Sequence, residues 1–226
     1  MGLEIEKNTV SAENQVSDNY LVKIVEKPNA KLKVMFIGNS ITRHEPKEEI
    51  GWLNDWGMAA SDISKDYVHV ALKLIEEKLQ QPVNYCIVHL SNWEKNYWED
   101  ERLEQFLAAR EYQADIVVFR IGENCWAARD MLPIYELFPH FDKMARYFVS
   151  NPNANVIMTS LFWPFDPVDE VIEKTAQKNG YTYVKMNDLG RREDTRAVGQ
   201  FWHTGVADHP NDYGMRLIAE RIVEKV

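Results

Sequence analysis

The sequence predicts an α/β fold with a parallel sheet, and two observations support this prediction. Short apolar runs that suit buried strands alternate along the chain with longer segments whose apolar residues recur at helical spacing. Such alternation indicates right-handed strand–helix–strand crossovers, which place successive strands parallel in one sheet. The length of 226 residues, of which 45% are hydrophobic, fits one domain with a sizeable core.

The expected elements follow from where these patterns begin and end. A first strand is expected over 32–38, because Val34, Phe36 and Ile37 belong to the nearly continuous apolar run of a strand covered on both faces. After the loop 43–62, apolar residues at spacings of four, three and four form one core-facing helical stripe, namely Val68, Leu72, Ile75 and Leu79. Further strands are expected at 81–88, 115–121, 155–161 and 181–186, and further helices at 99–111, 132–149, 167–179 and 211–226.

The first thirty residues differ from the rest of the chain. They are polar up to Asn19 and then become apolar from Tyr20 to Lys27, ahead of Pro28. We expect residues 1–30 to form an N-terminal arm or an extra edge strand. Residues 31–226 are expected to form one domain, because no repeat, low-complexity tract or linker divides them.

The charge balance limits the partners. With 26 Lys and Arg against 35 Asp and Glu, the net charge is −9 and the pI is near 5.2. Nucleic acids and anionic membranes require basic patches, so neither is expected as a partner. No apolar run approaches the roughly 20 residues that span a bilayer, so membrane insertion is not expected either. The sequence leaves the oligomeric state open.

Cofactors and a metal are not expected. The glycines form neither Gly-x-Gly-x-x-Gly nor a phosphate-binding loop, and the six histidines lack metal-ligand spacing. One of them, His203, lies in an aromatic segment and is expected to be packed or solvent-facing. No signal peptide is visible, so localisation stays open between the cytoplasm and, if a signal peptide was removed, the bacterial periplasm or exterior.

Three distant segments place chemistry-bearing residues at loops. Ser40 follows the strand that stops at Gly38, which is where an open α/β sheet binds ligands. Asn124 follows another apolar run and offers an amide donor for an oxyanion. His209 precedes Pro210 at the entry to the last helix, where its position is well defined. Together these residues suit a nucleophile, an oxyanion donor and a base.

The segments resemble the SGNH hydrolases, also called the GDSL esterase and lipase family. Gly38-Asn39-Ser40-Ile41 is similar to the Gly-Asp-Ser-Leu segment of that family, with Asn39 in place of aspartate, and assigns the nucleophile to Ser40. The family fold is a flavodoxin-like three-layer α/β/α sandwich. The resemblance therefore implies this sandwich with a parallel five-stranded sheet.

Three further segments carry the resemblance. Asp55-Trp56-Gly57-Met58 is the best match to the glycine segment whose N–H helps to form the oxyanion hole, which implies that role for Gly57. Gly122-Glu123-Asn124-Cys125 is similar to Gly-x-Asn-Asp, so the oxyanion hole is expected from Ser40, Gly57 and Asn124. His209-Pro210 matches the end of Asp-x-x-His-Pro and implies that His209 is the base.

The last segment departs from the family pattern, because the position three before His209 is Val206 and not aspartate. In a serine triad this acid holds the imidazole in its working tautomer. Three possibilities stay open: orientation of His209 by a backbone carbonyl such as that of Val206, assistance from Asp208 or Glu123, or loss of catalysis. We favour the first possibility and keep Asp208 as a candidate catalytic residue.

Tryptophans gather in the loops at the expected active face. Flat aromatic rings stack on sugar rings, so such a rim favours a carbohydrate ester over a long acyl chain. The expected substrate-binding residues are Trp56, Trp126, Trp163 and Trp202, with Glu123 beside Asn124. Within the resemblance, this rim implies a bacterial carbohydrate-esterase-like member that removes an O-acyl, most often O-acetyl, group.

Two other functional classes stay open. One is a thioesterase or lysophospholipase of the same fold. The other is a catalytically inactive glycan-binding protein, which the missing aspartate makes credible. The expected partner is in each case a small molecule or a glycan.

Overall fold

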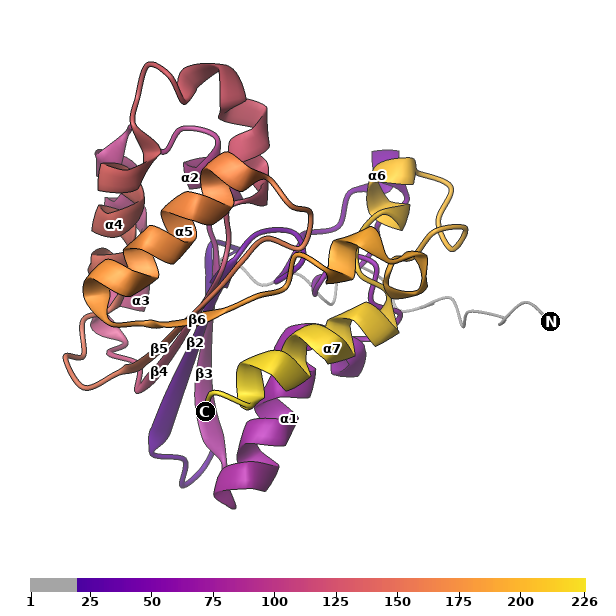
Figure 1. Cartoon of the computed structure of the whole chain (residues 1–226). Helices are drawn as coiled ribbons and strands as arrows, with labels where there is room; N and C mark the ends of the chain where they lie inside the picture. The colour runs from indigo at the N-terminus through magenta and orange to yellow at the C-terminus, as the bar shows by residue number, and fades with distance from the viewer. Residues whose placement is uncertain (1–19) are drawn as a thin grey trace.

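The computed structural model describes residues 20–226, in which a six-stranded sheet lies between two layers of helices (Figure 1). The strand order is β1-β3-β2-β4-β5-β6. β2 to β6 run parallel, whereas β1 pairs antiparallel with β3 at the edge. The strands are β1 Val22–Val25, β2 Leu32–Gly38, β3 Val83–His89, β4 Ile116–Arg120, β5 Asn155–Thr159 and β6 Thr182–Val184. The predicted α/β/α fold with five parallel strands is confirmed.

Helices cover both faces of the sheet. α1 (Tyr67–Leu79) and α7 (Asp212–Val223) pack together on one face, and α3 (Leu107–Glu111), α4 (Leu137–Phe148) and α5 (Asp166–Asn179) lie on the other (Figure 1). The two hydrophobic cores alternate along β2 as the pleat requires, with Val34 and Phe36 on the α1 side and Met35 and Ile37 on the α4 side. In the described part of the chain, no helix is long and apolar enough to cross a bilayer.

Most predicted elements are present, with two corrections. The helix expected over 132–149 begins at Leu137, because residues 132–134 form a turn and the backbone of Glu136 (ψ 119°) is not helical. The helix expected over 99–111 is divided into a 3₁₀ segment, Asp100–Phe106, and α3. For the N-terminal segment, β1 takes the form of an edge strand, and residues 1–19 of the expected arm lie outside the described residues.

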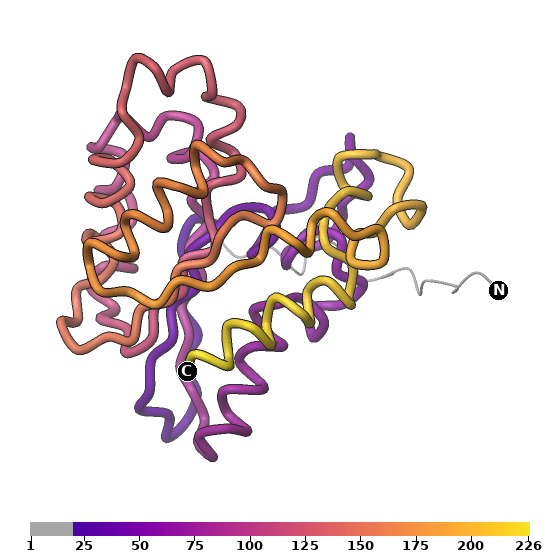
Figure 2. The backbone as a smooth tube through the Cα atoms, viewed as in Figure 1, coloured from indigo at the N-terminus to yellow at the C-terminus, as the bar shows by residue number. Residues whose placement is uncertain are grey.

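Two long segments meet above the carboxyl ends of the strands (Figure 2). The loop that follows β2 contacts the segment that precedes α7: the rings of Trp52 and Phe201 lie 6.2 Å apart, and the Ser61 hydroxyl donates to Asp212 at 2.7 Å. These contacts bring the C-terminal segment over the end of β2. Residues far apart in the sequence thereby share one site.

Candidate active site

Ser40 and His209 form a hydrogen-bonded pair at the end of β2. The chain turns there at Gly38, where a Cβ atom would lie 1.9 Å from the Thr42 hydroxyl, so only glycine fits. Ser40 Oγ lies 2.8 Å from His209 Nε2, although 169 positions separate the two residues. This distance suits a nucleophile and its general base.

The other ring nitrogen of His209 is held by a backbone carbonyl. His209 Nδ1 lies 2.7 Å from the carbonyl oxygen of Gly205, in the short helix α6 (Thr204–Ala207). A carbonyl can only accept, so Nδ1 carries the proton and Nε2 is left to accept from the Ser40 hydroxyl. The acceptor is the carbonyl of Gly205 and not that of Val206, which accepts the backbone N–H of His209 at 3.0 Å.

The surroundings keep His209 neutral. Burial lowers its pKa to about 4, and the bond to Gly205 raises it only in part. The ring of Trp163 packs edge-on against the imidazole, with centroids 5.1 Å apart. At neutral pH the imidazole is therefore unprotonated at Nε2, which is the form that a general base needs.

Asp208 does not support His209, so its predicted catalytic role is wrong. Its carboxylate accepts from Arg196 Nη1 at 2.5 Å, and 46% of its side chain is exposed. The carboxylate of Asp208 thus faces Arg196 and does not bond to the imidazole. The ring nitrogen that a triad acid would hold is already bonded to Gly205.

Glu123 neither orients His209 nor faces the pocket, which corrects both roles expected for it. Its carboxylate forms a two-pronged ion pair with the buried Arg120, at 2.7 and 2.8 Å, and accepts the backbone N–H of Phe162 at 3.0 Å. Burial alone would raise the pKa of Glu123, but Arg120 and the hydrogen-bond donors hold it below its ordinary value. Glu123 is thus a buried carboxylate that ties the end of β4 to the end of β5.

A pocket of about 230 Å³ opens beside Ser40 and His209. Asn124 lines it, as its expected oxyanion role requires, and among the described residues no Asp or Glu does. His203 lines it too, although the sequence favoured a packed or solvent-facing residue. The pocket-lining residues are Ser40, His44, Ile50, Met58, Ser91, Lys95, Asn124, His203, Gly205, Val206 and His209.

Gly57 does not lie in the pocket, and this predicted oxyanion donor is corrected. Its N–H donates to the buried carboxylate of Asp66 at 3.3 Å. A Cβ atom on Gly57 would lie 2.6 Å from the Ile41 carbonyl oxygen, so the glycine serves a close backbone approach. Ser91, which follows the end of β3, lines the pocket instead. The sequence contained a signal for it, since Ser91 comes just after a strand as Ser40 does.

The tryptophans divide into buried and exposed ones. Trp56 is 5% exposed and donates its ring N–H to Ala60, so its predicted role in substrate binding is wrong. Trp163 contacts His209 directly. Trp126 and Trp202 are 55% and 73% exposed, and Arg129 lies over the Trp126 ring at 4.6 Å. Among the described residues none of the four tryptophans lines the Ser40 pocket, and substrate contacts of Trp126, Trp163 and Trp202 stay a prediction.

A buried carboxylate that the sequence did not indicate lies behind the pocket. Glu94, in the short helix α2 (Ser91–Glu94), is fully buried and accepts from the side-chain amides of Asn39 at 3.0 Å and Asn124 at 2.6 Å. Burial and the neighbouring Glu123 raise the pKa of Glu94 to about 7. A helix of four residues has no periodic pattern, so only the fold reveals this contact.

The same cluster accounts for the asparagine at position 39, where the Gly-Asp-Ser-Leu segment that it resembles has aspartate. The Asn39 amide donates to Glu94 at 3.0 Å and to Glu123 at 2.7 Å, and its oxygen accepts from Arg120 at 2.8 Å. An aspartate has no N–H to donate, and it would add a third carboxylate between two others. Asparagine is therefore the side chain that this buried site requires.

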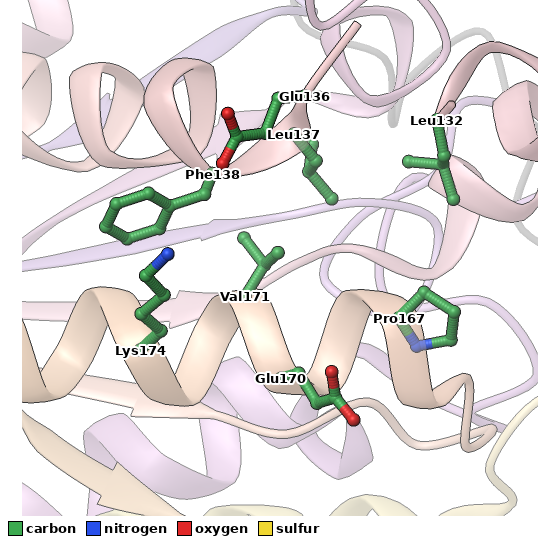
Figure 3. A pocket seen from close by; sticks show the side chains of 8 residues that line it. All are labelled: Leu132, Glu136, Leu137, Phe138, Pro167, Glu170, Val171 and Lys174. Carbon is green, nitrogen blue, oxygen red and sulfur yellow. The ribbon is translucent and has the colours of Figure 1, made fainter. Parts of the chain in front are cut away.

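A second hollow in the described part of the chain offers no comparable chemistry. This groove of about 290 Å³ between α4 and α5 is lined by apolar side chains with a few charges at the edge, and it contains neither serine nor histidine (Figure 3). Within residues 20–226, no group of three His, Cys, Asp or Glu side chains is placed to hold a metal ion. The Ser40 pocket is thus the candidate active site.

Comparisons with known proteins address the fold. No family model matches the sequence, and no curated protein matches it. A protein described as a GDSL-like lipase from Parabacteroides merdae aligns with a TM-score of 0.57 at 17% identity, over 88% of this chain and 98% of that one. The family 3 carbohydrate esterase of Clostridium thermocellum aligns with a TM-score of 0.56 at 14% identity, over 85% and 94%.

A third solved structure, the lipase/acylhydrolase from Enterococcus faecalis, has a TM-score of 0.51 at 13% identity, over 86% of this chain and 95% of that one. At such identities the likeness establishes a shared fold. The chain has the α/β/α fold of the GDSL-like lipases and carbohydrate esterases, as its four sequence segments predicted.

Proposed function

We propose that this protein is a serine esterase that hydrolyses a small O-acyl ester, and specifically an O-acetyl ester, on a carbohydrate. The observation that carries the proposal is the chain of two hydrogen bonds from Ser40 Oγ to His209 Nε2 and from His209 Nδ1 to the Gly205 carbonyl. This chain supplies a nucleophile, a base and an orienting acceptor, which together support acyl transfer.

The reaction proceeds in two acyl transfers. Ser40 Oγ attacks the ester carbonyl carbon while His209 Nε2 takes its proton, and the resulting imidazolium keeps its Nδ1–H bond to Gly205. His209 then gives the proton to the departing sugar hydroxyl, which leaves an acyl group on Ser40. Water attacks this acyl-enzyme with His209 again as base, and the carboxylic acid departs as Ser40 is restored.

The oxyanion is stabilised by donors from the loops that follow three adjacent strands. The Ser40 N–H and the Asn124 amide come from the ends of β2 and β4. In place of Gly57 we assign the third donor to the N–H of Ser91, which stands at the start of α2, where N–H groups have no helical acceptor.

The substrate class rests on the size of the pocket and on one exposed ring next to a pocket-lining residue. A volume of about 230 Å³ suits an acetyl or similarly short acyl group better than a long chain. Trp202, which is 73% exposed and precedes the pocket-lining His203, offers a ring of the kind that stacks on sugars. A screen of acetylated glycans would identify the sugar and the hydroxyl group that carries the ester.

Hydrolysis of p-nitrophenyl acetate by the wild type and by Ser40→Ala tests the proposal. Turnover that disappears with Ser40 supports a serine esterase. Turnover of acetylated sugars is then compared with turnover of long-chain acyl esters and of acyl thioesters. Preference for long-chain esters or thioesters would move the assignment to a lysophospholipase or thioesterase. Glycan binding without ester cleavage would identify a non-catalytic binding protein and overturn the proposal.

A further inference from the structure

We infer that Glu94 is a positioning residue, whose buried carboxylate fixes the amide of Asn124 in the orientation that oxyanion stabilisation requires. This inference rests on the proposed function and adds to it a residue outside the pocket lining. Glu94 is fully buried, whereas Asn124 lines the pocket with Ser40 and His209. Glu94 therefore acts through Asn124 and does not touch substrate.

One carboxylate joins the ends of three neighbouring strands. Glu94 lies on α2, directly after β3, and accepts from Asn39 after β2 and from Gly122 and Asn124 after β4. These strands are adjacent in the order β3-β2-β4. The loops that carry the nucleophile and the oxyanion donor are thus held to one another through Glu94.

The division of donors between the two carboxylate oxygens fixes the amide of Asn124. Oε1 accepts the backbone N–H groups of Gly122 and Asn124 at 2.7 and 3.2 Å and the Asn39 amide at 3.0 Å, whereas Oε2 accepts Asn124 Nδ2 at 2.6 Å. A carboxylate only accepts, so the nitrogen of the Asn124 amide, and not its oxygen, must face Glu94. The second N–H of that nitrogen is then set in direction by the plane of the amide.

The carboxylate oxygens of Glu94 accept hydrogen bonds from amide groups and not from a basic side chain. The nearest cation of the cluster, Arg120, bonds to Glu123 and to the Asn39 oxygen. Among residues 20–226, the structure shows no ion pair to Glu94. A buried carboxylate held only by amide donors depends on each of them, which suits a rigid positioning role.

Glu94→Gln tests this role with little change in shape. If the oxygen of the introduced glutamine keeps the three donors at the Oε1 position, its NH₂ group faces Asn124 Nδ2, and two donors oppose each other. The Asn124 amide must then turn and present its oxygen. We expect kcat on p-nitrophenyl acetate to fall by about tenfold or more, with KM changed less than about twofold, because an oxyanion donor acts mainly in the transition state.

A double-mutant cycle separates positioning from general damage. Asn124→Ala should lower kcat by about a hundredfold or more. If Glu94 acts through Asn124, Glu94→Gln added to Asn124→Ala should lower kcat by less than about twofold further. Two effects that multiply in the double variant would overturn the inference.

Asp142→Asn is the matched control. Asp142 is also a buried carboxylate, 2% exposed, and its oxygens accept from Lys178 and from the Asn179 amide on α5. It does not line the Ser40 pocket. Asp142→Asn should lower the melting temperature and leave kcat unchanged. An equal loss of kcat in Asp142→Asn and Glu94→Gln would show a structural effect only and would overturn the inference.

Two further outcomes are distinguishable. If Glu94→Gln does not fold, kcat of the wild type and of Asn124→Ala is measured as the pH is lowered. The decline in kcat that protonation of Glu94 causes in the wild type should be absent in Asn124→Ala. Persistence of that decline in Asn124→Ala overturns the inference. Wild-type protein without Ser40-dependent turnover overturns the proposed function itself, whereas Ser40-dependent turnover with multiplicative effects overturns only the role of Glu94.

Discussion

His209 Nδ1 lies 2.7 Å from the carbonyl oxygen of Gly205, so a peptide carbonyl occupies the position that a carboxylate has in a serine triad. A carbonyl selects the same imidazole tautomer as a carboxylate does, because it can only accept. It carries no charge, so it stabilises the imidazolium less than a carboxylate would. We therefore propose that Ser40 and His209 act as a dyad with a backbone anchor.

Asp208→Asn should therefore leave turnover nearly unchanged. The carboxylate of Asp208 pairs with Arg196 at a partly exposed position, and such pairs contribute about 0–1 kcal/mol to stability. We expect kcat/KM on p-nitrophenyl acetate within about twofold of the wild type, since loss of a true triad acid would cost orders of magnitude. A loss of a hundredfold or more would restore Asp208 as the third catalytic residue.

The pH profile of kcat/KM should decline in two steps on the acid side. The first step falls near pH 7, because the pKa of Glu94 is raised to about 7 and its protonated form loses an acceptor for Asn124. The second step falls near pH 4, where His209, whose pKa is lowered to about 4, becomes protonated and stops acting as a base. Both groups must lose a proton, so activity rises with pH at each step.

Glu94→Gln provides the control for this profile. Glutamine does not titrate, so the step near pH 7 should disappear. Only the decline near pH 4, where His209 becomes protonated, should remain. A single acid limb near pH 6.5, the usual value for histidine, would contradict the low pKa of His209.

Asn39→Asp should destabilise the fold. The change removes the N–H groups that serve the carboxylates of Glu94 and Glu123 and places a third acid between them. Breaking a buried charged network of this kind costs about 3–5 kcal/mol. Urea unfolding at pH 8, above the pKa of about 7 that burial and Glu123 give to Glu94, should show this loss of free energy of unfolding. Unchanged stability would mean that the Asn39 contacts contribute nothing.

The alternation of strands and helices could be predicted because it depends on local patterns. Five parallel strands follow apolar runs, and α1 follows a stripe of apolar residues, so the periodicity carried the information. The antiparallel pairing of β1 depends on a free edge of the sheet, which the sequence does not display. The late start of α4 at Leu137 depends on the non-helical backbone of Glu136, which the apolar spacing of the sequence does not record.

The site could be predicted only in part. Ser40 and Asn124 come directly after strands, and His209 stands before a helix, so topology alone brings them to one edge. The roles expected for Gly57 and Trp56 failed because the loop after β2 folds back and buries both residues. Such burial follows from tertiary contacts that no local pattern records.

The length of the acyl chain should control turnover strongly. The pocket beside Ser40 measures about 230 Å³, which suits a short acyl group. We expect kcat/KM to fall from p-nitrophenyl acetate to butyrate and to be lowest for octanoate. An apolar channel would instead raise kcat/KM along the series, because each buried CH₂ group adds about 0.8 kcal/mol of binding free energy. Rising kcat/KM along this series would indicate a lipid-like substrate.

Covalent labelling of Ser40 tests the central claim most directly. We would treat the protein with phenylmethylsulfonyl fluoride and locate the adduct by peptide mass spectrometry, with Ser40→Ala and His209→Ala as controls. Activation of Ser40 by His209 at 2.8 Å predicts one adduct on Ser40, absent from Ser40→Ala and formed far more slowly in His209→Ala. Equal labelling of Ser40 in wild type and His209→Ala, or no labelling of Ser40, would contradict a serine–histidine esterase.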